Sequence, residues 1–215
     1  IGLPSLKARI AQATCKVVGA NVTERLGGKK FTEPFAIEQA GPIKIAFLGL
    51  CFTRVEHPAS WAVKRTDPID VAKRLVPEIR KRADLVVAVT HIGLDEDQKL
   101  VAKVPGIDLV IGAHTHSVLP QGRTIKRSDG TQVLIAQAGE ELKFLGQVDL
   151  TLSQSSAQWR ITQATAKLIP LDEKIPLDPQ VTALIARLAG ATTQPATSRP
   201  TVPPGGNPLG AEMDR

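Results

Sequence analysis

Two apolar strands joined by a helix constrain the fold of this 215-residue chain more than any other feature. Residues 84–90 read DLVVAVT and residues 106–112 read GIDLVIG, and both runs are almost continuously apolar. Such runs are typical of strands that are buried on both faces of a sheet. The residues between them, 94–104, begin with acidic side chains and predict a helix. A strand, a helix and a second strand in this order predict a βαβ unit, in which the two strands are parallel and close together.

The rest of the sequence extends the same pattern. Helices are expected over residues 4–14, 67–82 and 178–190, and strands over 15–22, 34–51, 131–139, 145–153 and 159–171. The segment 34–51 is expected to form two strands around a Gly-Pro turn, and the last two strands are expected to pair antiparallel. Alternating strands and helices followed by a meander of strands predict an α/β layered domain.

Three of the four histidines follow the two strands of the βαβ unit: His91, His114 and His116. Because the carboxyl ends of parallel strands meet at one edge of a sheet, we expect these side chains to converge there. Neutral imidazole is the commonest metal ligand in proteins, so the pattern predicts a metal site. A lone histidine after a strand is more often structural, and three histidines with a water could also form a mononuclear zinc site. His57 follows no apolar strand and is interpreted as a surface-loop residue.

Residues 84–119 and 134–152 resemble the second half of a calcineurin-like metallophosphoesterase domain. The similarity is to the branch of 5′-nucleotidases, UDP-sugar hydrolases and cyclic-nucleotide phosphodiesterases. It rests on THIG, PGIDLVIGAHTH and QAG with a later LG, and it is supported by GANV at 19–22 and FLGL at 47–50. It covers roughly residues 5–175. The resemblance implies a layered αββα sandwich that is incomplete at its N-terminal side.

The resemblance also implies a two-metal phosphoester hydrolase. In that family the counterparts of His91 and His114 bind one metal, and the counterpart of His116 binds the other. The two cations, drawn from Zn, Mn, Fe or Co, neutralise the phosphoryl oxygens and activate a bridging water. The implied substrate is a small phosphorylated molecule, most simply a nucleotide, and the sequence identifies no substrate-binding residue.

The chain departs from the family pattern in two ways. Ala113 stands where the family commonly has glycine. The Asp-x-His, Gly-Asp and Gly-Asn-His motifs of the family's first half, which supply the other ligands and the catalytic histidine, do not occur. No catalytic residue is therefore assigned within the chain. The acidic residues nearest the histidines are interpreted as helix-start residues (Asp95, Glu96, Asp97) and as a loop after a strand (Glu140, Glu141).

These departures leave two functions open. The chain is either part of a two-metal phosphoesterase, inactive by itself, or a noncatalytic module that binds a metal or a nucleotide. The abrupt beginning at Ile1 favours the first interpretation. Family members are mostly exported, so a periplasmic or extracellular location is expected, and the oligomeric state is open.

The composition of the chain excludes some classes of partner and indicates where the domains end. The formal net charge is +6, but the basic residues are scattered and no aromatic platform accompanies them, so no nucleic-acid polymer is predicted as a partner. No apolar stretch approaches the ~20 residues of a membrane span. Cys15 and Cys51 are expected to be buried and reduced, with a single disulfide as the alternative. Residues 1–175 are assigned to the phosphoesterase domain, 176–190 to a terminal helix, and the Pro- and Thr-rich 191–215 to a disordered tail or linker.

Overall fold

The fold is taken from a computed structural model, which describes residues 2–53, 61–156 and 158–189. The chain forms two compact units, residues 1–170 and 171–215. In the second unit, helix α4 spans Pro179–Leu188 and begins at Asp178, whose side chain accepts hydrogen bonds from the N–H groups of Gln180 and Val181. His57 and residues 191–215 lie outside the described residues, so the predictions made for them are untested.

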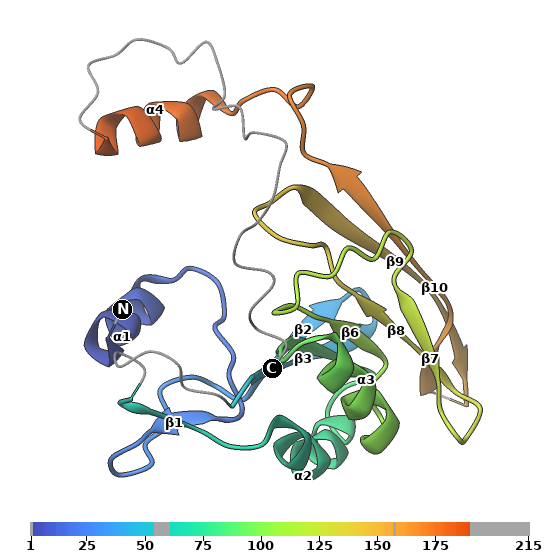
Figure 1. Ribbon diagram of the computed structural model, residues 1–215. Helices are drawn as coiled ribbons and strands as arrows, with labels where there is room; N and C mark the ends of the chain where they lie inside the picture. The colour runs from blue at the N-terminus through green and yellow to red at the C-terminus, as the bar shows by residue number, and fades with distance from the viewer. Residues whose placement is uncertain (1, 54–60, 157, 190–215) are drawn as a thin grey trace. The chain divides into compact units, whose positions relative to one another are not determined.

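A six-stranded mixed sheet organises the first unit (Figure 1). Its strands, in spatial order, are β2 (Phe35–Ala40), β3 (Ile43–Cys51), β5 (Leu85–His91), β6 (Leu109–Ile111), β8 (Gln132–Ala136) and β7 (Arg123–Lys126). The four inner strands are parallel, and the two edge strands run antiparallel to their neighbours. The carboxyl ends of β3, β5, β6 and β8 therefore meet at one edge, which contains the candidate site.

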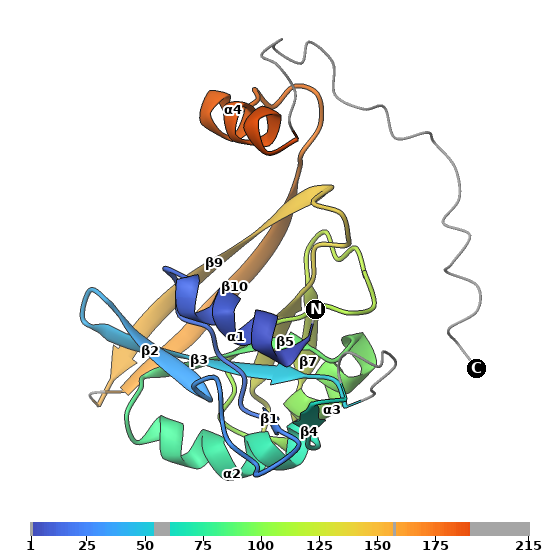
Figure 2. The same ribbon diagram turned by 90° about the vertical axis from the view of Figure 1, so that its left-hand side faces the viewer.

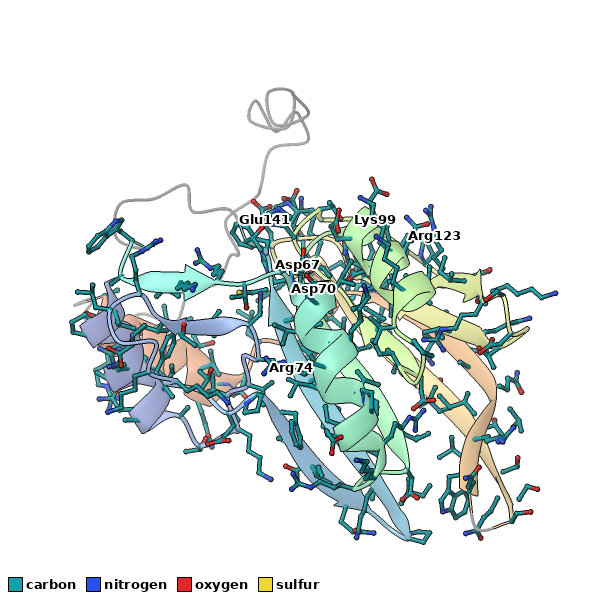
Figure 3. The ribbon with its side chains drawn as sticks, turned by 90° about the horizontal axis from the view of Figure 1, so that it is seen from below. Asp67, Asp70, Arg74, Lys99, Arg123 and Glu141 are labelled. Carbon is teal, nitrogen blue, oxygen red and sulfur yellow. The ribbon has the colours of Figure 1, made fainter. Side chains whose placement is uncertain are left out.

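Two helices cover one face of this sheet. Helix α2 (Pro68–Arg80) is followed along the chain by β5, and α3 (Leu94–Lys103) by β6. Asp67 caps α2 by accepting from the N–H groups of Ile69 and Asp70, and Pro68 occupies the first turn, as predicted. Figure 3 shows Asp67 and Asp70 at one end of α2, with Arg74 further along the helix. Strand and helix side chains form one apolar core whose buried members include Leu48, Val86, Val110, Ile135, Val76, Ile79, Leu100 and Val101.

A long antiparallel pair of strands covers the other face (Figure 2). These strands are β9 (Phe144–Ser155) and β10 (Gln158–Pro170). A second apolar cluster fills the space between the sheets, with Val87, Leu109 and Leu134 packed against Val148, Leu150, Ala164 and Ala166. The order of helices, mixed sheet and second sheet confirms the predicted α/β layered fold.

The N-terminal region differs from the prediction. Helix α1 forms at Leu3–Gln12, but residues 15–22 do not form a regular strand. The N–H of Gly19 donates to Glu33 and that of Ala20 to Gly49, so this backbone pairs singly with two different segments instead of with one partner strand. The structure has a short ribbon instead, β1 (Val22–Glu24) against β4 (Val63–Arg65).

The environments of the two cysteines also differ from the prediction in part. Both are free thiols, but Cys15 is exposed, and Cys51 is half-buried at the end of β3. Cys15 lies in the irregular segment that replaces the predicted strand, which explains why it is not buried. Among the described residues, no helix is both long and apolar enough to cross a membrane.

Candidate metal centre

His91 and His114 lie side by side at the carboxyl edge of the sheet. His91 is the last residue of β5, His114 follows the neighbouring β6, and their ring centroids are 5.2 Å apart. Phe52, which follows β3, contacts both rings. Its ring is stacked on His114 at 4.7 Å and tilted against His91 at 5.8 Å. Three adjacent parallel strands thus deliver two imidazoles and an aromatic wall to one place.

The loop that carries the second histidine has an unusual backbone. His114 has a φ of 90° and His116 a φ of 53°, in the left-handed region that favours glycine. Such conformations cost about 1–3 kcal/mol each and persist where surrounding contacts impose them, often at functional sites. The carbonyl of Ala113 accepts from the N–H of Gly93, and the Thr115 hydroxyl accepts from the N–H of Leu94. The loop is therefore fastened to the start of α3.

His116 forms its contact with a carboxylate rather than with the other two histidines. Its Nδ1 lies 2.8 Å from Oε2 of Glu140, a residue in the loop that follows β8. Within the described part of the chain, no group of three or more His, Cys, Asp or Glu side chains is arranged to hold a metal ion. The structure therefore brings the rings of His91 and His114 together, whereas the ring of His116 lies against Glu140.

Glu140 was not identified from the sequence as a site residue, and its interpretation as an ordinary loop residue was incomplete. The available signal was its position: it follows β8 at the same sheet edge as the histidines. Its neighbours Glu141 and Leu142 both have a φ of 56°, which shows a tight turn there. Figure 3 labels Glu141, the more exposed of the two glutamates.

The electrostatic environment favours neutral imidazole. Burial lowers the pKa of His91, and the neighbouring charges of His114 and His116 lower it further. A neutral ring is the form that can bind a metal. Arg65 lies over the same aromatic ring, with its Cζ 5.4 Å from the Phe52 ring centroid. The edge thus combines imidazole side chains with a nearby cation.

Asp97 lies in the first turn of α3, as predicted, but its side chain points into the core. It is fully buried, its Oδ1 accepts a 2.6 Å hydrogen bond from the Thr90 hydroxyl, and burial raises its pKa to about 7. Leu100 and Val101, three and four residues later, lie on the same buried face of α3. That spacing could have predicted the burial of Asp97, which its interpretation as a helix-start residue did not include.

The side chains present fit part of a divalent metal site. Imidazole nitrogen suits Zn, Mn, Fe and Co. A metal-binding histidine commonly has a carboxylate next to its second ring nitrogen, and the Glu140 carboxylate lies 2.8 Å from Nδ1 of His116. The described residues at this edge supply neutral donors, and Glu140 is already engaged by His116 and by Lys143. The donor set therefore fits a cation but contains no free carboxylate ligand of the kind that would bridge two.

The chain is similar in sequence to known nucleotide phosphoesterases. The chain is 32% identical over 204 residues to the 2′,3′-cyclic-nucleotide 2′-phosphodiesterase/3′-nucleotidase of Yersinia enterocolitica, which covers 80% of this chain and 31% of the relative. It is 28% identical over 151 residues to the trifunctional nucleotide phosphoesterase protein YfkN of Bacillus subtilis, covering 68% and 10%. The relatives of this chain include nucleotidases and cyclic-nucleotide phosphodiesterases. The predicted relationship to the nucleotide phosphoesterases is confirmed.

Solved structures of nucleotide phosphoesterases share the fold. The 5′-nucleotidase precursor of Thermus thermophilus superimposes with a TM-score of 0.74 at 25% identity, covering 86% of this chain and 39% of that one. The calcineurin-like phosphoesterase YfkN of B. subtilis gives 0.72 at 18% identity, covering 88% and 66%. No protein-family model matches the chain. The chain spans about a third of the length of the Yersinia phosphodiesterase.

Proposed function

We propose that this chain forms part of a metal-dependent phosphoester hydrolase that acts on small phosphorylated molecules, in particular nucleotides. The observation that carries the proposal is the adjacent pair His91 and His114, 5.2 Å apart at the carboxyl edge of the sheet. This pair occurs in a chain whose relatives bear the names of nucleotidases and cyclic-nucleotide phosphodiesterases. Because some of those relatives are snake-venom enzymes, we also propose that the protein acts outside the cytoplasm.

In this proposal His91 and His114 hold one divalent cation and His116 holds a second. A bound divalent cation polarises a phosphoryl oxygen and lowers the pKa of a bound water. Two features of this chain would prepare the site. Burial lowers the pKa of His91 and so favours its neutral form, and the Glu140 carboxylate lies against Nδ1 of His116 and would orient that ring. Phe52 closes one side of the His91–His114 pair against water.

The ligand set predicts unequal affinities for the two cations. Two divalent ions a few ångströms apart repel strongly, and an anionic ligand between them normally offsets this repulsion. The proposed ligands here are all neutral imidazoles. We therefore propose that the first ion, from the group Zn, Mn, Fe and Co, binds readily, whereas the second binds weakly to this chain alone, so that hydrolysis by the 215-residue chain is slow.

A second candidate function is a noncatalytic module that binds one metal ion or a nucleotide. The observation that favours it is the engagement of His116 by Glu140, because this leaves only two histidine rings next to each other among the described residues. Both candidate functions include metal binding, but only the hydrolase turns over a substrate.

The test combines metal titration with turnover. The chain, His91→Ala and His114→Ala are titrated with Zn²⁺ and Mn²⁺ by calorimetry and then assayed on p-nitrophenyl phosphate, bis-p-nitrophenyl phosphate and nucleoside monophosphates, with and without EDTA. Slow, EDTA-sensitive turnover that both substitutions abolish supports the hydrolase. Metal binding without any turnover, both in this chain and in a fusion that supplies the Asp-x-His, Gly-Asp and Gly-Asn-His motifs of the family's first half, supports the binding module. Absence of metal binding overturns both.

A further inference from the structure

A single buried amide, that of Gln137, fastens the loop that carries His114 and His116. Gln137 directly follows β8 and is only 4% exposed. Its Oε1 accepts a 2.5 Å hydrogen bond from the N–H of Ser117 and a 3.1 Å hydrogen bond from the Thr115 hydroxyl. These are the two residues on either side of His116, so one oxygen atom fixes both flanks of a proposed ligand.

The loop needs such a restraint because its backbone is strained. His114 and His116 both adopt a left-handed φ, which residues other than glycine hold only when their surroundings impose it. The Thr115 hydroxyl, which donates to Gln137, also accepts a hydrogen bond from the N–H of Leu94 at the start of α3. The strained loop is therefore tied to both β8 and α3.

The chemistry of position 137 has no other evident purpose. Nε2 of Gln137 is buried and has no hydrogen-bond partner among the described residues, and the same holds for Oδ2 of Asp97. Both atoms pack against Gly112. A buried polar atom without a partner lowers stability, so an apolar side chain of the same length would suit the packing better. The two bonds from Oε1 to the histidine loop account for the presence of an amide here.

We propose that Gln137 is a positioning residue that holds the loop 112–117 in the conformation that presents His114 and His116 to a metal ion. This inference rests on the function proposed above. The backbone should survive the loss of the amide, because Val118 and Ala138 form a β-bridge and the N–H of Gly139 donates to the carbonyl of Ser117.

The experiment compares Gln137→Met, which keeps the length and removes the acceptor, with Gln137→Glu, which keeps an oxygen at Oε1. Gln154→Met is the matched control, because it makes the same substitution at an exposed position of β9. Three quantities are measured: hydrogen exchange of the Ser117 amide, backbone chemical shifts of His114 and His116, and Co²⁺ affinity from visible absorption. Gln137→Met should speed exchange at Ser117, shift both histidines and weaken Co²⁺ binding about 10–100-fold. Gln154→Met should resemble the unsubstituted chain, and Gln137→Glu should keep slow exchange at Ser117 because its carboxyl oxygen still accepts from that N–H.

Each outcome decides the proposal. Unchanged Ser117 exchange and unchanged Co²⁺ affinity in Gln137→Met would overturn it. If the unsubstituted chain binds no Co²⁺, the proposed function fails, and the exchange rates and chemical shifts still decide whether Gln137 positions the loop. If Gln137→Met does not fold, Thr115→Val removes one of the same hydrogen bonds from the loop side, and unaltered shifts at His114 and His116 in that variant would overturn the proposal.

Discussion

Oε2 of Glu140 lies 2.8 Å from Nδ1 of His116, so Nε2 is the ring nitrogen of that histidine that faces away from the carboxylate. A carboxylate next to a metal-binding histidine orients the ring. We predict that Glu140→Ala weakens the metal affinity of His116 about 10–100-fold, as measured by calorimetric titration with Zn²⁺.

The neighbouring glutamate provides the control for that substitution. Glu141→Ala removes a carboxylate that is 66% exposed and pairs with Lys143, as Glu140 also does. It should leave the Zn²⁺ affinity unchanged. Equal effects of the two substitutions would mean that general charge, and not the bond to His116, determines affinity.

Loss of either ring of the histidine pair should have a larger effect than loss of Glu140. We predict that His91→Ala and His114→Ala each reduce Co²⁺ affinity beyond the about 100-fold that a supporting carboxylate contributes. His57→Ala is the control for altered histidine content. The measurement is Co²⁺ absorption, and retention of a tight site in either variant would remove that histidine from the proposed ligand set.

Asp97 should make stability depend on pH in a definite direction. Its carboxyl pKa rises from 3.8 to about 7 on folding, mainly because of burial. Between these values the folded chain binds more protons than the unfolded chain, so this group lowers stability as the pH rises from about 4 to about 7. Asp97→Asn should reduce this loss relative to the unsubstituted chain in urea unfolding across the same range.

The control for this pH series is Asp95→Asn, on the exposed side of the same helix. It should leave the slope of stability against pH unaltered. His91 contributes a slope of the opposite sign, since its pKa is lowered on folding, and that contribution is common to all variants. A slope that Asp97→Asn does not change would show that the Asp97 carboxyl stays ionised in the folded chain.

Gly112 should tolerate no side chain. A Cβ atom there would come closer to Oδ2 of Asp97 than real Cβ atoms approach any neighbour. We predict that Gly112→Ala destabilises the fold by about 1–3 kcal/mol in urea unfolding, the usual cost of overpacking. Gly146→Ala, whose Cβ would meet Ala138 at an ordinary 3.4 Å, should be nearly neutral. Combining Gly112→Ala with Asp97→Ala should be less destabilising than the sum, because the collision is removed.

Asn21 should be essential for joining the end of β3 to the residue that follows β4. It is 2% exposed, and its side chain bonds to both the N–H and the carbonyl of Cys51 and to the carbonyl of Thr66. Asn21→Ala removes the hydrogen-bond partner of three part-buried backbone groups, at about 1–3 kcal/mol for each group that is left unsatisfied. We predict a loss of at least about 2 kcal/mol in thermal or urea unfolding, whereas Gln39→Ala, on an exposed part of β2, should be almost neutral.

The spacing of apolar residues along the sequence predicted the layered fold, because in long strands and helices this spacing determines which side chains are buried. The strands at 84–90 and 106–112 and the helices after Asp67 and Gly93 follow directly from that coupling. The pairing of β1 with β4 was not predicted, because both are three-residue strands far apart in the sequence. The burial of Asp97 was missed because local charge suggested a cap while the packing of α3 decided the outcome.

The sequence predicted which histidines lie at the candidate site, but it did not predict the contact between His116 and Glu140. The βαβ spacing indicated that His91 and His114 would be neighbours, and their rings are 5.2 Å apart. The bond of His116 to Glu140 depends on how two loops fold over the ends of β6 and β8, and the sequence has no periodic signal for loop geometry. The assignment of the three histidines as metal ligands stays a prediction until a metal is titrated.

The positive φ angles at His114 and His116 make selection for folding and selection for chemistry act in opposite directions at these codons. In a library randomised at position 114 and sorted only for soluble, protease-resistant protein, glycine and asparagine should become more frequent than histidine, because they adopt this backbone at least cost. The same library sorted for retention on immobilised Zn²⁺ should recover histidine. Comparing the enrichment of histidine in the Zn²⁺ sort with that of glycine and asparagine in the stability sort would therefore measure the conformational strain that a histidine at position 114 imposes on the fold.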